Sequence, residues 1–233
     1  MALPGASQIL YVNRTGDDGW LQVMPAKAGP LAAICKYTKL QVLASTAGRT
    51  SLHILDGPLK GQKVSLSDSN VRVYLGTKAP LQSLAHIEVT YGKYVPGWIS
   101  VARNNQALDQ QMATVKIGSL TVNATMNTNW GVGFTPIPAG SYTVLVPDAP
   151  HDKSMTRFYR AVAPALKSDQ VWFPIKYGDN SRYVHVGNVS DGCTTVLDLD
   201  RWADVCEAII SHRGPDGISV AHLVVKGTPE RSK

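Results

Sequence analysis

Short runs of strand-forming residues, each closed by a turn that contains glycine or proline, recur along this chain of 233 residues. Twenty glycines and 14 prolines accompany many Val, Thr and Tyr residues, a combination typical of strand-rich, turn-rich folds. Hydrophobic residues make up 44% of the chain and charged residues 17%, which argues against disorder and allows a substantial core. The sequence therefore predicts a mainly β protein.

The first 78 residues are expected to form a small all-β unit. Strand-like runs lie at 8–12, 20–24, 40–43, 51–55 and 71–75. Short strands at this spacing suggest an SH3-like barrel, a common binding appendage, and the alternative is that they extend the sheet of the following domain. The short segment 76–80 contains Gly and Pro and is the best candidate for a domain boundary. We therefore expect two domains, at 1–78 and 79–233.

The second domain is expected to contain more strands and one clear helix. Alternating runs occur at 85–91, 98–101, 114–117, 120–124, 141–146 and 218–226. The polar stretch 104–111 reads as a loop or a short helical turn. After Asp198 or Asp200, either of which can cap a helix, an apolar stripe at helical spacing runs through Trp202, Val205, Cys206, Ile209 and Ile210.

The segment 183–193 carries the residues best suited to catalysis. His185 ends a strand-like run and Cys193 follows eight positions later, with small and polar residues between them. A thiolate nucleophile needs a nearby imidazole to take its proton, and a tight turn lets backbone N–H groups face a developing oxyanion. The sequence predicts a Cys193–His185 dyad with a depressed thiol pKa, whereas the plainer alternative is a buried cysteine near an unrelated histidine.

Several neighbouring residues are candidates for the rest of this site. The turn Ser190-Asp191-Gly192 would supply the oxyanion N–H groups, and a backbone carbonyl or Asn188 would orient His185. Expected lining residues are Gly187, Asn188, Tyr183, Arg182, Tyr177, Thr135 and Trp130. Trp172 is a further rim candidate, with a core position as its alternative. Asp191 opposes ionisation of Cys193 unless a cation such as Arg182 is paired with it.

The stretch Ser190-Asp191-Gly192-Cys193, preceded by His185 and Gly187, resembles the catalytic signature of the L,D-transpeptidase (YkuD-type) family. A second segment, Phe134 to Tyr142, resembles the Thr-Pro-x-Gly-x-Phe/Tyr segment of that family, and the likeness covers roughly residues 81–225. The chain departs from the family in three places. The His–Cys spacing is shorter, Asp191 stands where a histidine is usual, and Thr194-Thr195 replaces a common arginine. This contracted form is similar to phage and secreted-effector relatives.

The resemblance implies a β-sandwich catalytic domain that acts on peptidoglycan stem peptides as an L,D-carboxypeptidase or L,D-transpeptidase. Cys193 would attack a peptide carbonyl, and the acyl-enzyme would pass to water or to an amine. A non-catalytic binding or structural protein that retains the fold is the alternative, supported by the missing arginine and histidine. A general cysteine protease ranks lower, because no supporting Asn/His pair stands at a recognisable spacing.

The charge and the cysteine content limit the classes of partner, metal and cofactor that we expect. With 23 Lys and Arg against 17 Asp and Glu, the net charge of +6 favours anionic partners such as cell envelopes. No basic run or aromatic-interleaved basic motif is present, so nucleic acid is not expected. Cys35, Cys193 and Cys206 show no metal-ligand pattern, and neither a metal nor a cofactor is expected. Cys35 and Cys206 read as small buried hydrophobes.

Localisation is the last expectation drawn from the sequence. Residues 1–7 lack a charged leader with an apolar run, and no stretch of about 20 apolar residues could span a membrane. Together with the resemblance, this favours a bacterial protein made in the cytoplasm and exported by a leaderless route to the cell wall. An immunity protein or a secretion machine would then be a partner.

Overall fold

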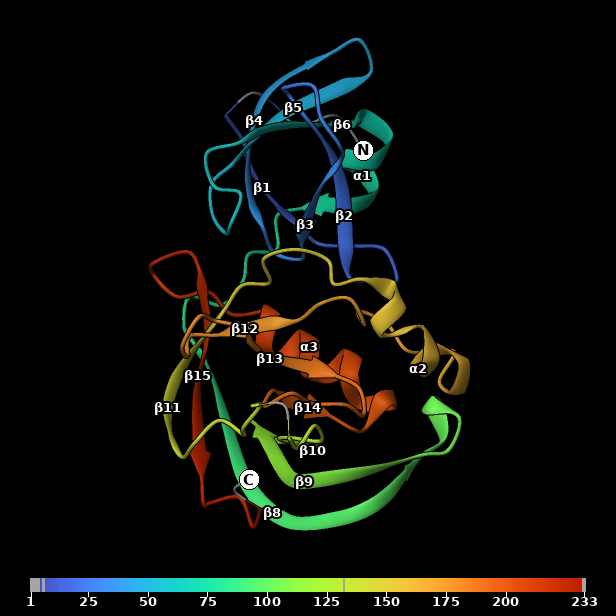
Figure 1. Ribbon diagram of the computed structural model, residues 1–233. Coiled ribbons are helices and arrows are strands. Elements are labelled where there is room, and N and C mark those ends of the chain that lie inside the picture. The colour runs from blue at the N-terminus through green and yellow to red at the C-terminus, as the bar shows by residue number, and fades with distance from the viewer. Residues whose placement is uncertain (1–4, 6, 132, 232–233) are drawn as a thin grey trace.

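The computed structural model describes residues 5, 7–131 and 133–231, and it shows two β-sheets stacked end to end (Figure 1). Residues 1–4 and 6, which carry most of the argument about a leader, lie outside the described residues. The mainly β prediction is confirmed. Helices contribute little of the described chain, and the longest of them lies in the C-terminal half, as the sequence predicts.

The first sheet has seven strands in the order β3-β2-β6-β5-β4-β1-β7. They are β1 (Ile9–Val12), β2 (Trp20–Pro25), β3 (Ala32–Cys35), β4 (Lys39–Thr46), β5 (Arg49–Ile54), β6 (Lys63–Ser67) and β7 (Leu75–Gly76). Alternating burial along β4 and β5 places one face of each strand in a core of its own, which includes Leu40, Leu52 and Val64.

The run 71–75, expected as a strand, is instead largely helical. It belongs to α1 (Asp68–Tyr74), and only Leu75 returns to a strand. The Ser67 hydroxyl caps this helix by accepting a hydrogen bond from the Asn70 N–H, while Asp68 and Arg72 suit the two ends of the helix dipole. These end contacts outweigh the strand preference of the β-branched residues Val71 and Val73.

The second sheet closes into an eight-stranded barrel in the order β10-β14-β13-β12-β11-β15-β8-β9. Its strands are β8 (Ala85–Ser100), β9 (Gln106–Ile117), β10 (Leu120–Thr125), β11 (Gly140–Leu145), β12 (Phe173–Ile175), β13 (Arg182–Val186), β14 (Thr194–Val196) and β15 (Ser219–Lys226). The pairs β13–β14 and β15–β8 are parallel, and the remaining pairs are antiparallel. This strand order does not confirm the expected β-sandwich.

The helical pieces of the second unit lie between its strands. They are η1 (Val101–Arg103), η2 (Lys153–Met155), α2 (Arg157–Val162), η3 (Leu199–Arg201) and α3 (Trp202–Ile210). The stretch 104–111 is not a loop or a helical turn throughout, because β9 starts at Gln106 and pairs with the far end of β8 in a long hairpin. Its first polar residues are exposed, whereas Gln110 and Gln111 are buried and donate hydrogen bonds to the carbonyl oxygens of Asn188 and Gly92.

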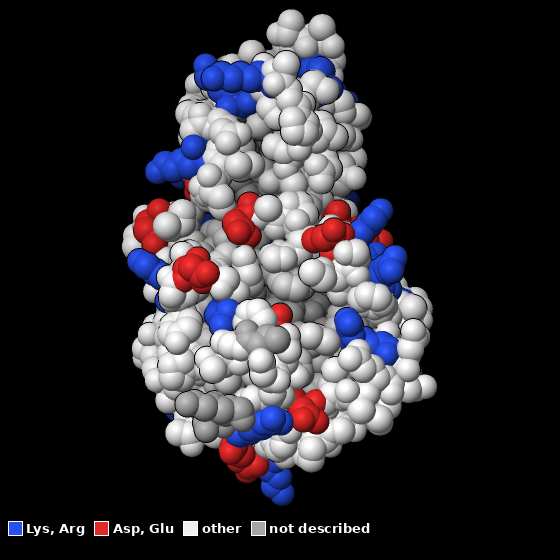
Figure 2. All heavy atoms as spheres, viewed as in Figure 1, with Lys and Arg blue, Asp and Glu red and all other residues white. Residues whose placement is uncertain are grey.

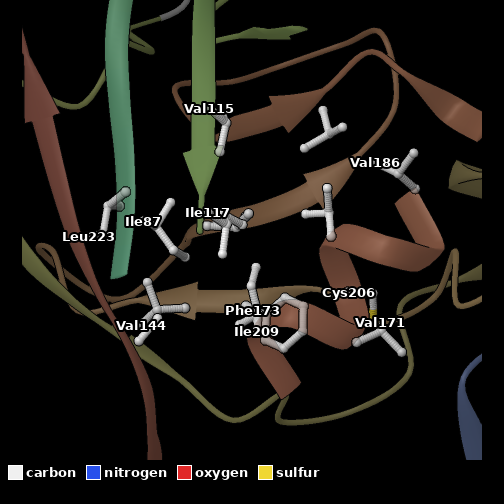
Figure 3. Close-up of a cluster of buried hydrophobic side chains, with 14 of the residues drawn as sticks. Ile87, Val115, Ile117, Val144, Val171, Phe173, Val186, Cys206, Ile209 and Leu223 are labelled. Atoms are coloured by element: carbon white, nitrogen blue, oxygen red, sulfur yellow. The ribbon is translucent and has the colours of Figure 1, made fainter. Parts of the chain in front are cut away.

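The apolar stripe of α3 packs against the barrel, as its spacing predicts. Trp202, Val205, Cys206, Ile209 and Ile210 are all buried. Figure 3 shows Ile209 and Cys206 facing residues from several strands, among them Phe173 and Val186. The predicted cap by Asp198 or Asp200 is wrong: neither η3 nor α3 has a side-chain cap hydrogen bond, and Asp198 instead accepts a hydrogen bond from the Asn123 N–H at 2.8 Å.

The two units pack directly on each other. Trp20, Cys35 and Tyr37 of the first unit belong to the buried cluster of the second. The Tyr37 hydroxyl donates a hydrogen bond to Glu207 of α3 at 2.7 Å, and the Trp20 indole N–H donates to the Gln170 carbonyl at 3.1 Å. The change of sheet falls between Gly76 and Ala85, but the hydrophobic core continues across it.

Candidate active site

The parallel pair β13–β14 sets the position of the candidate dyad. His185 pairs with Thr195 in the register of the two strands, and the neighbouring residues Val184, Val186 and Val196 enter the buried core. Because side chains alternate along a strand, His185 and Thr195 lie on the opposite face of the pair. Cys193 comes two residues before Thr195, and the prediction that His185 sits on a strand end is confirmed.

His185 is held by two hydrogen bonds and one stacked ring. Nδ1 lies 3.0 Å from the Val186 carbonyl oxygen, and Nε2 lies 3.0 Å from the Thr195 hydroxyl. The Trp172 ring stacks on the imidazole with centroids 3.8 Å apart. Trp172 reaches this place because the antiparallel register of β12 and β13, in which Phe173 pairs with Val184, puts residue 172 beside His185.

The environment of His185 fixes its protonation state. Burial lowers its pKa to about 3, although the hydrogen bond to Val186 acts in the other direction. The imidazole is therefore neutral near pH 7. Since a carbonyl can only accept, Nδ1 carries the proton, and Nε2 accepts a hydrogen bond from the Thr195 hydroxyl. The orienting group, left open by the sequence, is thus the Val186 carbonyl.

Cys193 is buried and un-ionised. Its Sγ accepts a hydrogen bond from the Tyr183 N–H at 3.4 Å, and its side chain is 6% exposed. Burial raises its pKa to about 11; the Tyr183 N–H and Arg182 lower the pKa, whereas Asp191 raises it. The expected depressed thiol pKa is wrong for this state of the protein, because the low-dielectric surroundings outweigh the nearby cation.

Cys193 directly precedes β14, and its sulfur contacts the Tyr183 N–H of β13, two residues before His185, but no hydrogen bond joins Cys193 to His185 among the described residues. Both ring nitrogens of His185 are engaged by Val186 and Thr195, and the Cys193 sulfur is engaged by Tyr183. Cys193 is displaced along the strand direction by two residues, or about 6.6 Å, from the partner of His185.

The turn before Cys193 requires a glycine. Gly192 has φ +91°, and a Cβ at this position would lie 2.3 Å from the Thr135 carbonyl oxygen and 2.6 Å from Arg182 Nε. The two segments of the family resemblance, around Thr135 and around Cys193, are therefore in contact. Ser190 stabilises the turn from within, because its hydroxyl donates to the Cys193 carbonyl oxygen at 2.8 Å.

Asn188 anchors the loop that joins β13 to β14. Its N–H donates to the Tyr159 hydroxyl at 2.9 Å, its Oδ1 accepts from the Ser100 hydroxyl at 2.8 Å, and its carbonyl accepts from the Gln110 amide at 2.9 Å. Gly187 lies against the same Tyr159 ring. Asn188 therefore ties the loop to β8, β9 and α2, and it does not orient His185.

Two buried polar atoms near the thiol have no hydrogen-bond partner among the residues that the structure describes. They are Arg182 Nε and Asp191 Oδ1. The Arg182 guanidinium also lies over the Phe134 ring, 5.7 Å from its centroid, so it bridges the two motif segments. An unpaired buried donor and acceptor are costly in a protein that binds nothing, and they suit a site that receives a polar ligand.

The aromatic candidates divide into two groups. Tyr183 shares the outer face with His185 and meets His151 edge to face, with ring centroids 4.8 Å apart. Tyr177 instead packs edge to face on Tyr142. Trp130 donates from its indole N–H to the Asp109 carbonyl at 2.8 Å and also contacts Tyr94. Neither Tyr177 nor Trp130 makes a described contact with the dyad.

Sequence reasoning missed three residues of this site. Thr195 binds the basic nitrogen of His185, His151 covers Trp172 at 4.0 Å between ring centroids, and Tyr159 holds the loop. Two-residue alternation from Cys193 could have placed Thr195 on the same face. His151 and Tyr159 come from distant segments, and no local pattern in the sequence indicates them.

The comparisons with known proteins identify no family for this chain: no protein-family model, curated protein or solved structure matches it. Among the described residues, no group of His, Cys, Asp and Glu side chains could hold a metal ion. No helix in that part of the chain is long and apolar enough to cross a membrane.

Proposed function

We propose that this protein is a cysteine-dependent acyl-transfer enzyme that acts on bacterial peptidoglycan stem peptides, as an L,D-carboxypeptidase or an L,D-transpeptidase. The observation that carries the proposal is the β13–β14 unit, in which His185 pairs with Thr195 and the Cys193 sulfur, just before β14, contacts the Tyr183 N–H of β13, with the Thr135 segment against Gly192. The substrate class comes from the sequence resemblance. In this view the barrel is a divergent L,D-transpeptidase domain and the first unit is an SH3-like accessory domain.

In the proposed reaction, His185 Nε2 takes the proton of Cys193 while the sulfur attacks the peptide carbonyl carbon. Nε2 is the correct nitrogen because Nδ1 already carries a proton that is bound to the Val186 carbonyl. The same proton then passes to the leaving amine, and the Cys193 thioester remains. Water or an acceptor amine attacks this thioester, which regenerates the thiol and releases the product.

Activation is coupled to substrate binding in this proposal. The resting thiol has a raised pKa and the resting imidazole a lowered one, so charge separation between them is unfavourable. A bound peptide would displace the Thr195 hydroxyl from Nε2 and present an oxyanion to the N–H groups of residues 191–193. Charge would then form only where these dipoles and Arg182 stabilise it.

The test is incubation of the protein with muropeptides, with the products identified by mass. We expect loss of a terminal residue or formation of a cross-link, and we expect Cys193→Ala to abolish both while it retains the folded state. His185→Ala should lose nearly as much, because the two residues act as a unit. Cys206→Ala is the matched control, since Cys206 is equally buried but belongs to α3. Full turnover by Cys193→Ala would refute the assignment.

A non-catalytic binding or structural role is the second candidate. It is favoured by the hydrogen bonds that occupy both ring nitrogens of His185 and leave the thiol unpaired with it. The same incubation separates the two functions. A binding protein would retain muropeptides without altering them, and Cys193→Ala would bind them as the native chain does.

Delivery to the cell wall is part of the proposal, since peptidoglycan lies outside the cytoplasmic membrane. We propose an antibacterial effector or phage-like enzyme that acts at the cell wall, with a secretion machine or an immunity protein as partner. Expression in the bacterial cytoplasm should be tolerated, whereas a version fused to a periplasmic signal peptide should cause lysis. The toxicity should disappear with Cys193→Ala. Equal tolerance of both forms, with folded protein in the periplasm, would contradict this proposal.

A further inference from the structure

Two arginines converge on one aromatic ring beside the candidate site. Arg103, at the end of η1, lies 5.0 Å from the Phe158 ring centroid, and Arg157, at the start of α2, lies 5.4 Å from it. The two guanidinium carbons are therefore no more than about 10 Å apart. Phe158 positions both groups although they come from segments more than 50 residues apart in sequence.

These arginines are not neutralised by carboxylates of the described chain. Neither takes part in an ion pair there, and the one side-chain hydrogen bond of Arg103 is to the neutral amide of Gln106, at 3.2 Å. Arg157 shares a shallow cavity with Asp17, Asp18 and Asp169, but Asp169 pairs with Arg160; the pKa of Asp152 is lowered mainly by Ser154 and least by Arg157. Arg157 is exposed and Arg103 is partly exposed, so both can reach a ligand.

The pair is attached to the loop that carries the dyad. Ser100, three residues before Arg103, and Tyr159, two residues after Arg157, both hydrogen-bond to Asn188. Asn188 is three residues from His185. Figure 2 shows Lys and Arg side chains on both sides of the central hollow, with those on one side lying over α2 and the adjoining end of the β8–β9 hairpin.

We propose that Arg103 and Arg157 form a carboxylate-binding subsite, the arginine pair, which recognises an acidic substrate peptide and sets its specificity. This inference rests on the proposed function. Guanidinium groups bind carboxylates through paired, charge-assisted hydrogen bonds, and stacking on Phe158 reduces the freedom lost on binding. Because Ser100 and Tyr159 tie the segments of both arginines to Asn188, in the loop between His185 and Cys193, we expect the recognised carboxylate on a residue close to the reacting carbonyl.

The test measures binding without turnover. The full-length Cys193→Ala protein is titrated with a synthetic tetrapeptide that carries a Glu side chain two residues from the scissile carbonyl, and with the same peptide carrying Gln. We expect the Glu peptide to bind about tenfold more tightly, in line with the strength of charged hydrogen bonds, and the difference to shrink as salt is added.

Two variants assign the preference to the arginine pair. Arg103→Gln combined with Arg157→Gln should weaken binding of the Glu peptide about tenfold and leave the Gln peptide unchanged. Arg72→Gln, an exposed charge on α1 of the first unit, is the control for lost net charge and should change neither affinity. Thermal unfolding of each variant checks that the fold is intact.

Each outcome of the titration decides the proposal. Equal affinity for the two peptides, no binding of either, or an equal effect of Arg72→Gln would overturn the subsite. Tighter binding of a single-stranded oligonucleotide through the same arginines would also overturn it, in favour of a nucleic-acid surface. If the native chain cleaves Glu and Gln substrates at equal rates, only the subsite fails. If it cleaves nothing while the Glu peptide binds preferentially, only the proposed enzyme fails.

Discussion

At the scale of single residues, the site is in a resting state in which burial suppresses the charge of both reacting groups. His185 and Cys193 are both buried, and their pKa values move in opposite directions, to about 3 and about 11. Arg182 and Asp191 act on the thiol with opposite signs. The reactivity of Cys193 therefore depends on these two side chains more than on His185 when no substrate is bound.

The pH dependence of alkylation tests this balance. The thiolate forms as pH rises toward about 11, so iodoacetamide should modify Cys193 slowly at pH 7 and progressively faster above pH 9. Asp191→Asn should shift this profile to lower pH, and Arg182→Gln should shift it to higher pH. Peptide mapping by mass identifies the modified cysteine. Rapid labelling of Cys193 at pH 7 would show that the thiol is already activated and would contradict the resting state described here.

At the scale of elements, the sequence predicts individual strands and helices well, but it does not predict that the strands close into a barrel. The stripe of α3 and the alternation of β11 and β15 are local signals, and both elements form where they are expected. The helix α1 was missed because its cap at Ser67 competes with strand-forming valines. Barrel closure through β15 and β8 pairs residues more than 130 positions apart, and no local pattern specifies it.

The candidate site shows the same difference between local and long-range information. The His185–Cys193 segment could be read from the sequence because both residues lie in one strand–loop–strand unit. The aromatic rings that stack over His185 could not be predicted from the sequence. The position of Trp172 depends on the register of β12 and β13, and His151 belongs to a separate connection. Protonation states were also misjudged, because burial decides them and burial is a property of the folded molecule.

Gly192 offers a test at this scale. Gly192→Ala would place a methyl group 2.3 Å from the Thr135 carbonyl oxygen at a strained φ, so we expect the turn to move and activity to fall at least tenfold, with about 1–3 kcal/mol of stability lost. Gly118→Ala is the matched control. Gly118 also has a positive φ, +57°, but its Cβ would meet open space. Equal activity losses in the two variants, measured by turnover and urea unfolding, would show that contact with the Thr135 segment is unimportant.

At the scale of the whole molecule, the first unit packs against the barrel, and a buried ion pair lies between them. The Asp56–Arg213 ion pair, 3.3 Å between Arg213 Nε and Asp56 Oδ2, is buried between the units. Among the described residues, none of the three guanidinium nitrogens of Arg213 has a hydrogen-bond partner. Burial raises the pKa of the Asp56 carboxyl, although the neighbouring arginine lowers it. Removing either partner would therefore leave the other charge buried without a counter-charge.

Breaking this pair should uncouple or unfold the protein. Asp56→Asn leaves Arg213, which cannot lose its proton, buried without a counter-charge, and we expect a loss on the order of 3 kcal/mol in the free energy of unfolding. Urea unfolding followed by fluorescence and circular dichroism measures it. Glu88→Gln, which breaks the exposed pair with Lys226, should leave the unfolding midpoint nearly unchanged. If Asp56→Asn behaves like this control, the buried pair does not hold the units together.

The central claim, that Cys193 is an acylated nucleophile, is tested most directly by intact-protein mass spectrometry after rapid mixing with a stem-peptide substrate. The account predicts a transient mass increase equal to the acyl fragment, located on Cys193 by peptide mapping and abolished by Cys193→Ala. In Cys206→Ala the same adduct should form. Product formation without any adduct on Cys193, or an adduct that persists in Cys193→Ala, would contradict the claim.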